Sequence, residues 1–413
     1  MTKDEVTRFK NQYDFRSDVL DVIVGGKSSL DSPNVFQISI LEEADRFIQS
    51  YGYDLENPIE NAEILGNFHE SLNFIRKYFL HPGNSDGLKI EIPRKVLELT
   101  DVRELLLFAS FSKRGQTQDP QGLTLQNWAC SLLKVMHTIS HIDKDLRSPY
   151  FSDIQKQIFD RFYKLVHRDT EGHLYLGEKD DDPLRVDLTA FETKPKKSRD
   201  SIILKLLHKP ENVAEDIFDR VGIRLITPTT LGALRVVKYL KDKMVIIPSN
   251  IKPSRSRNTL LDTEEFRIRL SEVLKKLPEE GAQEKQLAMH LEEALLNPRV
   301  SPSNPHSSEF YRAIQFTCRQ LIKLKNPMYE VLRDLRNTVK ETSPNVELLK
   351  ILDRVDPKSI QKEVRFFYPY EVQIVDQKSA EENEKGRSAH SEYKRAQVIT
   401  AMKRVMGGLG DAL

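Results

Sequence analysis

The hydrophobic period of this chain changes near residue 147, and that change limits the possible folds more than any other feature of the sequence. Before it, apolar residues recur at helical spacing, most clearly over 64–79 and 125–139. After it, apolar and polar residues alternate over 184–189, which is the period of a half-buried strand. We therefore expect a helical domain at 1–150 and a mixed-sheet domain of α/β or α+β class at 151–413.

Within the second segment, the same periods predict strands that alternate with helices. Two charged amphipathic stretches, about 257–300 and about 324–362, interrupt this order, and each is bounded by Pro or Asn. We expect both to be helical insertions on the surface, and the alternative is a lid or a partner-binding arm. The predicted strands are 184–189, 221–226, 244–247, 312–318 and 368–376, and the predicted helices are 153–166, 200–208 and 231–240.

Charge and cysteine content exclude several classes of protein. Lys plus Arg number 63 and Asp plus Glu number 62, so the net charge of +1 excludes a uniformly basic coat for nucleic acid and leaves a local basic site open. The two cysteines, Cys130 and Cys318, lack the spacing of a zinc site or a redox pair, which favours a reducing compartment. The N-terminus lacks the apolar core of a signal peptide, and no apolar run approaches the roughly 18 residues of a membrane span. We expect a cytoplasmic protein without a membrane partner.

A basic segment precedes one predicted helix and has residue types that bind phosphate. Four cations lie between 194 and 199, directly before that helix, which Asp200 or Ser201 can cap. Lys197, Ser201 and Lys205 are four residues apart, so they share one helical face. A solvated basic surface is the more ordinary explanation of such a run.

Polar residues at the starts of two predicted strands are candidate ligands for metal and phosphate. Asp219 comes just before the strand at 221–226, where a carboxylate can hold Mg²⁺ against phosphate oxygens. Arg224 lies within that strand and needs an anionic partner, which an ordinary ion pair with Asp219 would also provide. Tyr311 precedes the strand at 312–318, so its ring can stack on a base, although core packing is the more common role.

The last predicted strand carries a polar pair on one face. Alternation places Glu371 and Gln373 on one face of the strand and Val372 and Ile374 on the other. A carboxylate beside an amide on a sheet face indicates a site rather than a core. Glu371 can therefore ligate a metal or accept the proton of an attacking hydroxyl.

In this order, these segments resemble the synthetase domain of the RelA/SpoT homologues, the enzymes of alarmone synthesis. The run from Ser201 to Lys205 is similar to the family's Ser-Ile segment, which has a Lys four residues after the Ser. Residues 219–224 resemble its Asp-Leu-x-x-x-Arg segment, and residues 311–315 resemble its Tyr-Gln-Ser-Leu-His element.

The longest match begins at Glu371. The family has Glu-Val-Gln-Ile, then a Gly, then Ala-His-Trp-x-Tyr-Lys. This chain has the same intervals in 371–374, Gly386, Ala389-His390 and Tyr393-Lys394. The resemblance covers about residues 185–397 without the two insertions.

The resemblance implies a nucleotidyltransferase fold and a pyrophosphokinase that moves pyrophosphate from ATP to the 3′-hydroxyl of a guanosine nucleotide. It implies Mg²⁺ as the cofactor, held by Asp219 and Glu371, with Glu371 also orienting or deprotonating the hydroxyl. The further roles that it implies are polyphosphate binding by Lys197, Ser201, Lys205 and Arg224, stacking of the acceptor base on Tyr311, and support of the site by Gln373 and His390.

Four positions depart from the family's pattern and leave the identity of both nucleotides open. The family's first Arg of the basic segment aligns with Pro195, so Lys194 or Arg199 would have to substitute for it. The other departures are Phe310 for a Gly, Gln315 for a His and Val375 for an Arg. Two alternatives remain: an enzyme that pyrophosphorylates the 3′ end of tRNA, as some small toxic relatives do, and a sensor that binds a nucleotide without catalysis.

The helical first domain offers one further candidate site. His137, His141 and Asp145 are four residues apart, so they share one helical face, as metal ligands would. The chain contains no His-Asp dipeptide of the kind found in the hydrolase domain of the long family members. We therefore expect a polar helix edge here and assign no hydrolysis to this domain.

Overall fold

The computed structural model of the protein divides into two compact units. Unit 1 comprises Met1–Asp145, Lys197–Ile217 and Ser391–Leu413, and unit 2 comprises Leu146–Lys196 and Phe218–His390. Each unit has a hydrophobic core of its own, and the two cores share no residue. The residues that the structure describes are 6, 22, 24–28, 30–31, 38–110, 120–179, 181–194, 197–209, 220–276, 284–293, 295, 311–342, 347, 350–352, 361–384 and 390–410.

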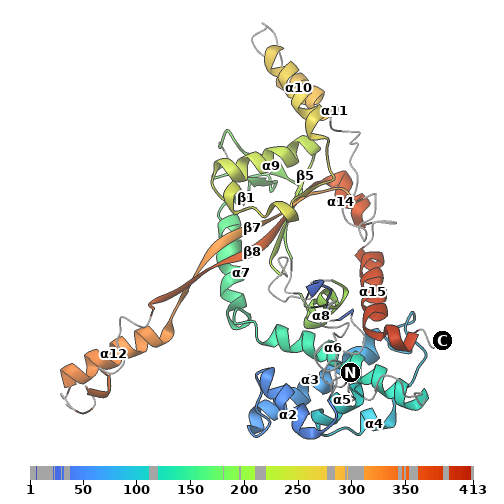
Figure 1. Ribbon diagram of the computed structural model, residues 1–413. Helices are drawn as coiled ribbons and strands as arrows, with labels where there is room; N and C mark the ends of the chain where they lie inside the picture. The colour runs from blue at the N-terminus through green and yellow to red at the C-terminus, as the bar shows by residue number, and fades with distance from the viewer. Residues whose placement is uncertain are drawn as a thin grey trace. The chain divides into compact units, whose positions relative to one another are not determined.

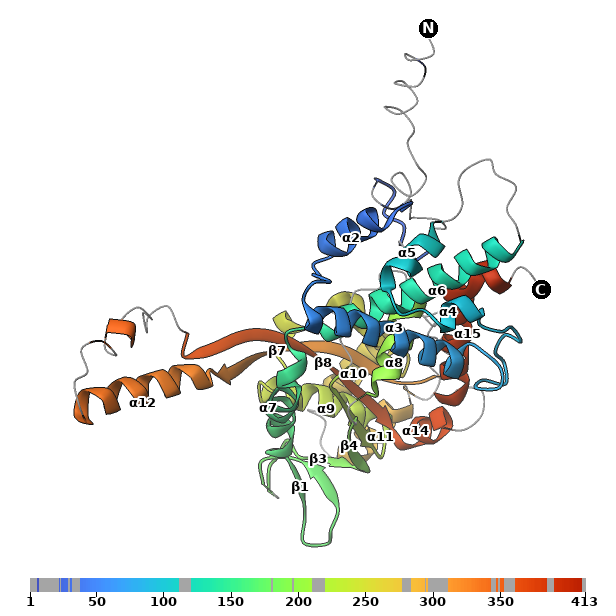
Figure 2. The ribbon, with the colours of Figure 1, turned by 90° about the horizontal axis from the view of Figure 1, so that it is seen from below.

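The described part of unit 1 is helical, as predicted for the start of the chain. Helices α3 and α5 both pack on α6 (Figures 1 and 2). The helices are α2 (Leu41–Ser50), α3 (Pro58–Tyr78), α4 (Arg94–Leu97), α5 (Val102–Ala109), α6 (Pro120–Asp143), α8 (Arg199–His208) and α15 (His390–Gly410).

Helices α3 and α5 begin at residues whose side chains accept hydrogen bonds from the first turn. Asn57 accepts from the amide of Ile59 at 3.0 Å, and Pro58 follows it at a position where no amide hydrogen is needed. Asp101 accepts from the amide of Arg103 at 2.9 Å at the start of α5. The local sequence therefore explains where α3 and α5 start.

The predicted apolar stripes of α3 and α6 form the centre of the core of unit 1. Phe68 and Ile75 of α3 are fully buried, and so are Trp128 and Leu132 of α6. Burial of such stripes supplies most of the stability of a helical unit. Helices α8 and α15 add further buried residues to the same core, namely Ile203, Leu206, Leu207, Ala401, Val405 and Met406.

The described part of unit 2 contains two sheets. The larger has the strand order β4-β5-β8-β7-β6, in which β5 and β8 are parallel and the other neighbours antiparallel. The smaller is antiparallel with the order β1-β2-β3. The strands are β1 (Val166–Arg168), β2 (Leu174–Leu176), β3 (Val186–Leu188), β4 (Ala190–Thr193), β5 (Gly222–Thr227), β6 (Arg257–Asn258), β7 (Ile314–Lys325) and β8 (Glu363–Asp376).

Both predicted insertions of unit 2 contain helices, but the first begins with β6 and the second begins with the end of β7, so neither is helical throughout its described residues. Strands β7 and β8 form a long two-stranded ribbon that carries α12 at its far end (Figure 1). The helical segments of unit 2 are η2 (Ser148–Tyr150), α7 (Phe151–Tyr163), α9 (Thr230–Asp242), η4 (Pro248–Asn250), η5 (Pro253–Arg255), α10 (Thr263–Lys276), α11 (Glu284–Glu293), α12 (Pro327–Thr342) and α14 (Gln377–Glu384).

One face of the larger sheet is apolar and packs against α7 and α9. Ile223 of β5 and Val372 of β8 are fully buried in the core that also holds Ile158 of α7 and Val236 of α9. Because side chains alternate along a strand, the residues next to Ile223 and Val372 point to the opposite face. That opposite face carries the candidate site.

Helix α11, in the first insertion, contacts the start of α9. The carboxylate of Glu292 accepts hydrogen bonds from the amides of Thr230 at 2.9 Å and Leu231 at 2.8 Å. The side chain of Thr229 accepts a third from Gly232. A carboxylate at a helix N-terminus is favourable because it neutralises unpaired amides and the positive end of the helix dipole.

The predicted strand at 244–247 is wrong, because this segment closes the C-terminus of α9. Met244 has a φ of 55°, in the left-handed region, and turns the chain back on the helix. The amides of Val245 and Ile246 then donate to the carbonyl of Leu240 at 2.9 and 3.1 Å. Val245 and Ile246 are buried by this cap, whereas Met244 and Ile247 are exposed, and the apolar composition of the run alone cannot distinguish this from a buried strand.

No helix in the described ranges of the chain combines the length and the apolar character that crossing a lipid bilayer requires.

Candidate functional site

A row of polar side chains crosses all five strands of the larger sheet on the face opposite the core of unit 2. Backbone register pairs Glu192 with Arg224, Arg224 with Gln373, Gln373 with Gln315, and Gln315 with Arg257. Residues directly opposite each other on neighbouring strands share a face, so the five side chains form one line. We call these five residues the polar row.

Glu371 lies in the next line of the same face and contacts two donors. Lys194 Nζ forms an ion pair with Glu371 Oε2, and Gln315 Nε2 donates to Glu371 Oε1. Glu371 is 7% exposed, so its charge requires such partners. The structure therefore joins Glu371 to the polar row through Gln315.

Gly222 allows Lys194 to reach Glu371 across β5. The amide of Lys194 donates to the carbonyl of Gly222 at 2.8 Å, and register places Gly222 opposite Glu371. A Cβ at Gly222 would come within 2.5 Å of Lys194 Cδ. The lysine side chain thus occupies the space that a side chain on Gly222 would fill.

Arg224 provides a guanidinium with unused hydrogen-bonding capacity. Its Nη1 lies 3.5 Å from Glu192 Oε2 and 3.3 Å from Glu384 Oε1, on α14. The Arg224 side chain is only 15% exposed, and its Nε is buried without a hydrogen-bond partner among the described residues. An unsatisfied buried donor is costly, and an anionic ligand would satisfy it.

Tyr311 lies just before β7 and contacts the polar row. Gln373 Nε2 donates to the Tyr311 hydroxyl oxygen, and Gln373 is 6% exposed. The predicted grouping of Glu371, Gln373, Arg224 and Tyr311 therefore corresponds to one face of one sheet. Val375, where the family has an Arg, is fully buried beside Ile226 and Ala380 and closes one end of this face with apolar side chains.

The basic segment is divided between the units, since Lys194 belongs to unit 2, whereas Lys197, Arg199 and α8 belong to unit 1. Ser198, rather than Ser201 or Asp200, caps α8, and its hydroxyl oxygen accepts from the amide of Ser201 at 3.3 Å. Lys197, Ser201 and Lys205 are all half-buried. They are described within unit 1, whereas Arg224, Glu371 and Gln373 are described within unit 2.

Arg199 forms ion pairs with acidic residues of unit 1. It is one of the two residues proposed to replace the Arg that contacts the ATP base in the family. Its guanidinium donates to Glu70 at 2.5 and 3.0 Å and to Asp143 at 2.5 and 2.8 Å. These carboxylates raise the pKa of Arg199 further above its ordinary value. Asp200 likewise accepts from Lys77 and Tyr78, at 2.7 and 2.8 Å. Arg199 and Asp200 therefore stabilise unit 1.

The structure describes Glu371 but not Asp219, the other carboxylate proposed to bind magnesium. Asp219 lies outside the described residues, as do Pro195 and Phe310, and His390 begins α15 without a described side chain. Within the described ranges, no group of three or more His, Cys, Asp or Glu side chains is arranged to hold a metal ion. Glu371 is held by Lys194 and Gln315, so the described residues alone do not complete a metal site.

On α6, the side chain of His137 contacts both His141 and Tyr51. The ring of His137 lies 4.4 Å from that of His141, and His137 Nδ1 shares a hydrogen bond with the Tyr51 hydroxyl. Burial lowers the pKa of His137 to about 4, and the neighbouring His141 contributes to this shift.

Three residues of the site were not predicted from the sequence in the roles that the structure gives them. Lys194 was considered for a nucleotide base and not for Glu371, and Glu192 and Arg257 were not considered. The alternation of Phe191 and Thr193 with Glu192 and Lys194 is a period-two signal that could have identified β4 and its polar face. Which strands would be its neighbours could not have been read from that pattern.

Comparison of the chain with models of protein families, with curated proteins and with solved structures found no match.

Proposed function

We propose that unit 2 carries the catalytic face of a nucleotidyltransferase that moves pyrophosphate from ATP to the 3′-hydroxyl of a guanosine nucleotide. The observation that carries this proposal is the convergence of Glu371, Gln373, Arg224 and Tyr311 on one sheet face. These residues come from three segments far apart in the sequence, and each belongs to a segment that resembles a motif of the RelA/SpoT synthetases. A purely structural role would not require a buried carboxylate, a buried amide and a partly unsatisfied guanidinium on one face.

The chemistry of these groups suits phosphoryl transfer. Arg224 would bind phosphate oxygens with the donors that Glu192 and Glu384 leave free. Tyr311 would stack on the acceptor base while Gln373 holds its hydroxyl. Lys194 would exchange Glu371 for a phosphate oxygen, which frees the carboxylate to receive a proton.

The proposed step conserves atoms and charge. The acceptor's 3′-oxygen bonds to the β-phosphorus of ATP, and its proton passes to Glu371. The bond from the β-phosphorus to the oxygen bridging to the α-phosphate breaks, and AMP leaves. Most of the rate would come from positioning and charge neutralisation.

Mg²⁺ stays the proposed cofactor because the resemblance includes its two carboxylates, Asp219 and Glu371. Bound there, it would neutralise charge on the ATP phosphates. Lys197, Ser201 and Lys205 of unit 1 stay the proposed polyphosphate ligands, and His390 stays a proposed supporting residue.

The test is incubation of the purified chain with Mg²⁺, ATP labelled in its γ-phosphate, and GDP or GTP. We expect labelled guanosine product and AMP in equal amounts. Glu371→Gln should lower transfer by about 100-fold or more, because it removes the proton acceptor, and Asp219→Ala should abolish it. Glu363→Gln is the matched control, since Glu363 lies on the same strand and pairs with Arg365 at 2.8 Å, away from the polar row.

Two outcomes would contradict the proposal. Nucleotide binding without turnover would identify a sensor, for which the ion pair of Glu371 with Lys194 would be the structural explanation. A wild-type chain that neither binds nor converts any nucleotide would exclude both enzyme and sensor.

A second acceptor, the 3′ end of an RNA, is favoured by the outer half of the β7–β8 ribbon. Register pairs Leu321 with Phe367 and Lys323 with Arg365 on the face that also carries the polar row. Leu321 is 40% and Phe367 53% exposed. The exposed cations of this face are Arg319, Lys323, Lys325 and Arg365.

Cations beside an exposed aromatic ring are the usual means of holding single-stranded nucleic acid. From Gln315 to Lys325 the ribbon spans about 33 Å at the rise of a strand. It would therefore guide several nucleotides toward the polar row. No such length of charged surface is needed for a mononucleotide acceptor.

The two acceptors can be separated in one assay. Labelled transfer to tRNA, lowered at least tenfold by Lys323→Glu with Lys325→Glu while transfer to GDP is unchanged, would support RNA. Transfer to GDP alone would exclude RNA as acceptor.

A further inference from the structure

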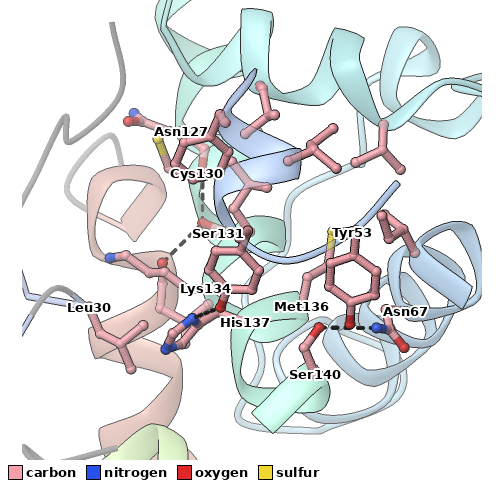
Figure 3. Close-up of a pocket in the computed structure, with 18 of the residues that line it drawn as sticks. Leu30, Tyr53, Asn67, Asn127, Cys130, Ser131, Lys134, Met136, His137 and Ser140 are labelled. Atoms are coloured by element: carbon pink, nitrogen blue, oxygen red, sulfur yellow. Dashed lines mark hydrogen bonds between the residues drawn. The ribbon is translucent and has the colours of Figure 1, made fainter. Parts of the chain in front are cut away.

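A cavity of about 240 Å³ lies within unit 1, between α2, α3, α5, α6 and α15 (Figure 3). At the share of liquid volume that one water occupies, this is room for about eight waters. The cavity is partly open to solvent, since Phe47 and Tyr51 in its lining are 36% and 43% exposed. A mostly apolar concavity with a few polar groups is the usual form of a small-molecule site.

The walls of the cavity are mostly apolar. Among the described residues, the lining contains one Lys and no Asp, Glu or Arg. Its apolar lining includes Phe47 and Ile48 of α2, Val102 and Leu106 of α5, and Leu133 and Met136 of α6.

The polar groups at one end of the cavity satisfy each other. Asn67 Nδ2 donates to Ser140 Oγ at 3.1 Å, and the Tyr53 hydroxyl donates to Glu63 at 3.0 Å. In Figure 3, Tyr53, Asn67 and Ser140 lie together on the side away from Lys134. This end has little capacity left for a ligand.

The other end retains a cation. Lys134 Nζ donates to the carbonyl of Arg404 at 3.2 Å, its one hydrogen bond to a described residue, although an ammonium has three hydrogens to donate. Burial lowers the pKa of Lys134. The neighbouring Ser131 hydroxyl donates to the carbonyl of Val405 at 3.0 Å. The ammonium of Lys134 is therefore the group at this end that still has hydrogens to donate to a ligand.

The remaining titratable groups at this end are neutral at pH 7. Burial lowers the pKa of His137 to about 4 and raises the pKa of Tyr51 to about 12 and that of Cys130 to about 11. The nearest acidic group of the neighbouring segment, Asp31, is paired with Arg404 at 2.8 Å. An anion entering the cavity therefore meets one cation and no lining carboxylate.

We propose that this cavity binds a small amphiphilic carboxylate, with its apolar body among the α2, α5 and α6 side chains and its carboxylate on Lys134. A single ammonium suits one carboxylate, whereas a phosphate group requires more donors than this end offers. The size of the cavity suits a ligand with roughly eight to twelve non-hydrogen atoms. The binding site lies wholly within unit 1 and does not depend on the proposed activity of unit 2.

Binding of three eight-carbon probes to the full chain tests the proposal. Octanoate, 1-octanol and octylammonium share an apolar body and differ in head group, and calorimetry compares their affinities. We expect octanoate to bind at least tenfold more tightly than the other two. Methyl NMR of Met136, which lines the cavity, should shift with octanoate, while Met289 of unit 2, which is 62% exposed, should not.

Variants of Lys134 decide whether the head group is recognised as proposed. Lys134→Met should abolish the preference for octanoate, Lys134→Arg should keep it, and Lys95→Met on the exposed surface of α4 should leave it unchanged. The arginine variant keeps the test valid if the methionine variant does not fold. Equal binding of all three probes, a shift that spares Met136, or an unchanged preference in Lys134→Met would overturn the proposal.

Discussion

At the scale of single residues, the site of unit 2 depends on one residue that has no side chain. Gly222 leaves room for Lys194 to cross β5 and reach Glu371, which is buried beside Gln315. A buried carboxylate that loses its cation is left with an uncompensated charge. The pair therefore contributes to stability as well as to the proposed chemistry.

We expect Lys194→Met to lower the free energy of unfolding by about 2 kcal/mol at pH 7, because it leaves Glu371 charged without its partner. Adding Glu371→Gln should restore part of the loss, because the double variant has no unpaired charge. Denaturant unfolding of the two single variants and the double variant measures this coupling. Additive effects of the two substitutions would show that the ion pair contributes nothing.

A second residue-scale prediction concerns His137 and pH. Its pKa is about 4 in the folded chain, where Tyr51, His141 and Lys134 surround it, against 6.5 for an ordinary histidine. Between these two values the unfolded chain binds more protons, so the free energy of unfolding falls as the pH is lowered from 6.5 toward 4.

We expect this residue to account for a loss of about 2–3 kcal/mol across that interval. His137→Asn removes the titration, so the variant should lose less stability than the wild type when urea unfolding at pH 7 and pH 4.5 is compared. Parallel pH profiles of the two proteins would be inconsistent with a buried neutral His137.

At the scale of elements, one face of the β7–β8 ribbon packs in the core of unit 2, and the other face is exposed. Ile322 and Leu324 are buried in the core of unit 2, and Gln157 of α7 bonds to the backbone of Lys323 at 2.8 and 3.1 Å. The other face exposes Leu321 and Phe367. Alternation along a strand produces this separation without any change of backbone.

Two adjacent leucine-sized residues of β7 provide a matched comparison. Ile322→Ala should cost about 3 kcal/mol, because it opens a cavity at a fully buried position. Leu321→Ala removes a side chain that is 40% exposed and should cost less than about 1 kcal/mol. Denaturant unfolding of both variants measures the difference. An equal loss in free energy of unfolding would show that Ile322 is not on the buried face of the ribbon.

At the scale of the whole molecule, the chain builds two hydrophobic cores with no shared residue. The first core draws on three separated segments of the chain, since α8 and α15 join α3 and α6. Separate cores unfold separately unless an interface couples them strongly.

We therefore expect two transitions on thermal unfolding, each sensitive to its own core. Leu132→Ala, at a fully buried position of unit 1, should lower one midpoint, and Ile322→Ala in unit 2 should lower the other. Calorimetry of the two variants tests this. One transition that both substitutions shift equally would mean that the units unfold together.

Features that repeat within a single helix or strand could be predicted from the amino-acid sequence. Helical spacing identified the buried faces of α3 and α6, and alternation placed Glu371 and Gln373 together on one face of a strand. The apolar run at 244–247 shows where such reasoning fails, because a helix cap and a strand bury the same composition. The identities of the donor and the acceptor stay predictions that no pattern of this kind decides.

The order of the strands in the larger sheet, by contrast, follows from contacts between distant segments of the chain. Insertion of β8 between β5 and β7 places Arg224 and Gln315 on either side of Gln373, and the close approach at Gly222 gives Lys194 to Glu371. Side-chain alternation is a local property of an extended backbone, so it can be read along the chain. Strand order depends on pairing between distant segments and on the core that they bury together, and no single segment encodes either.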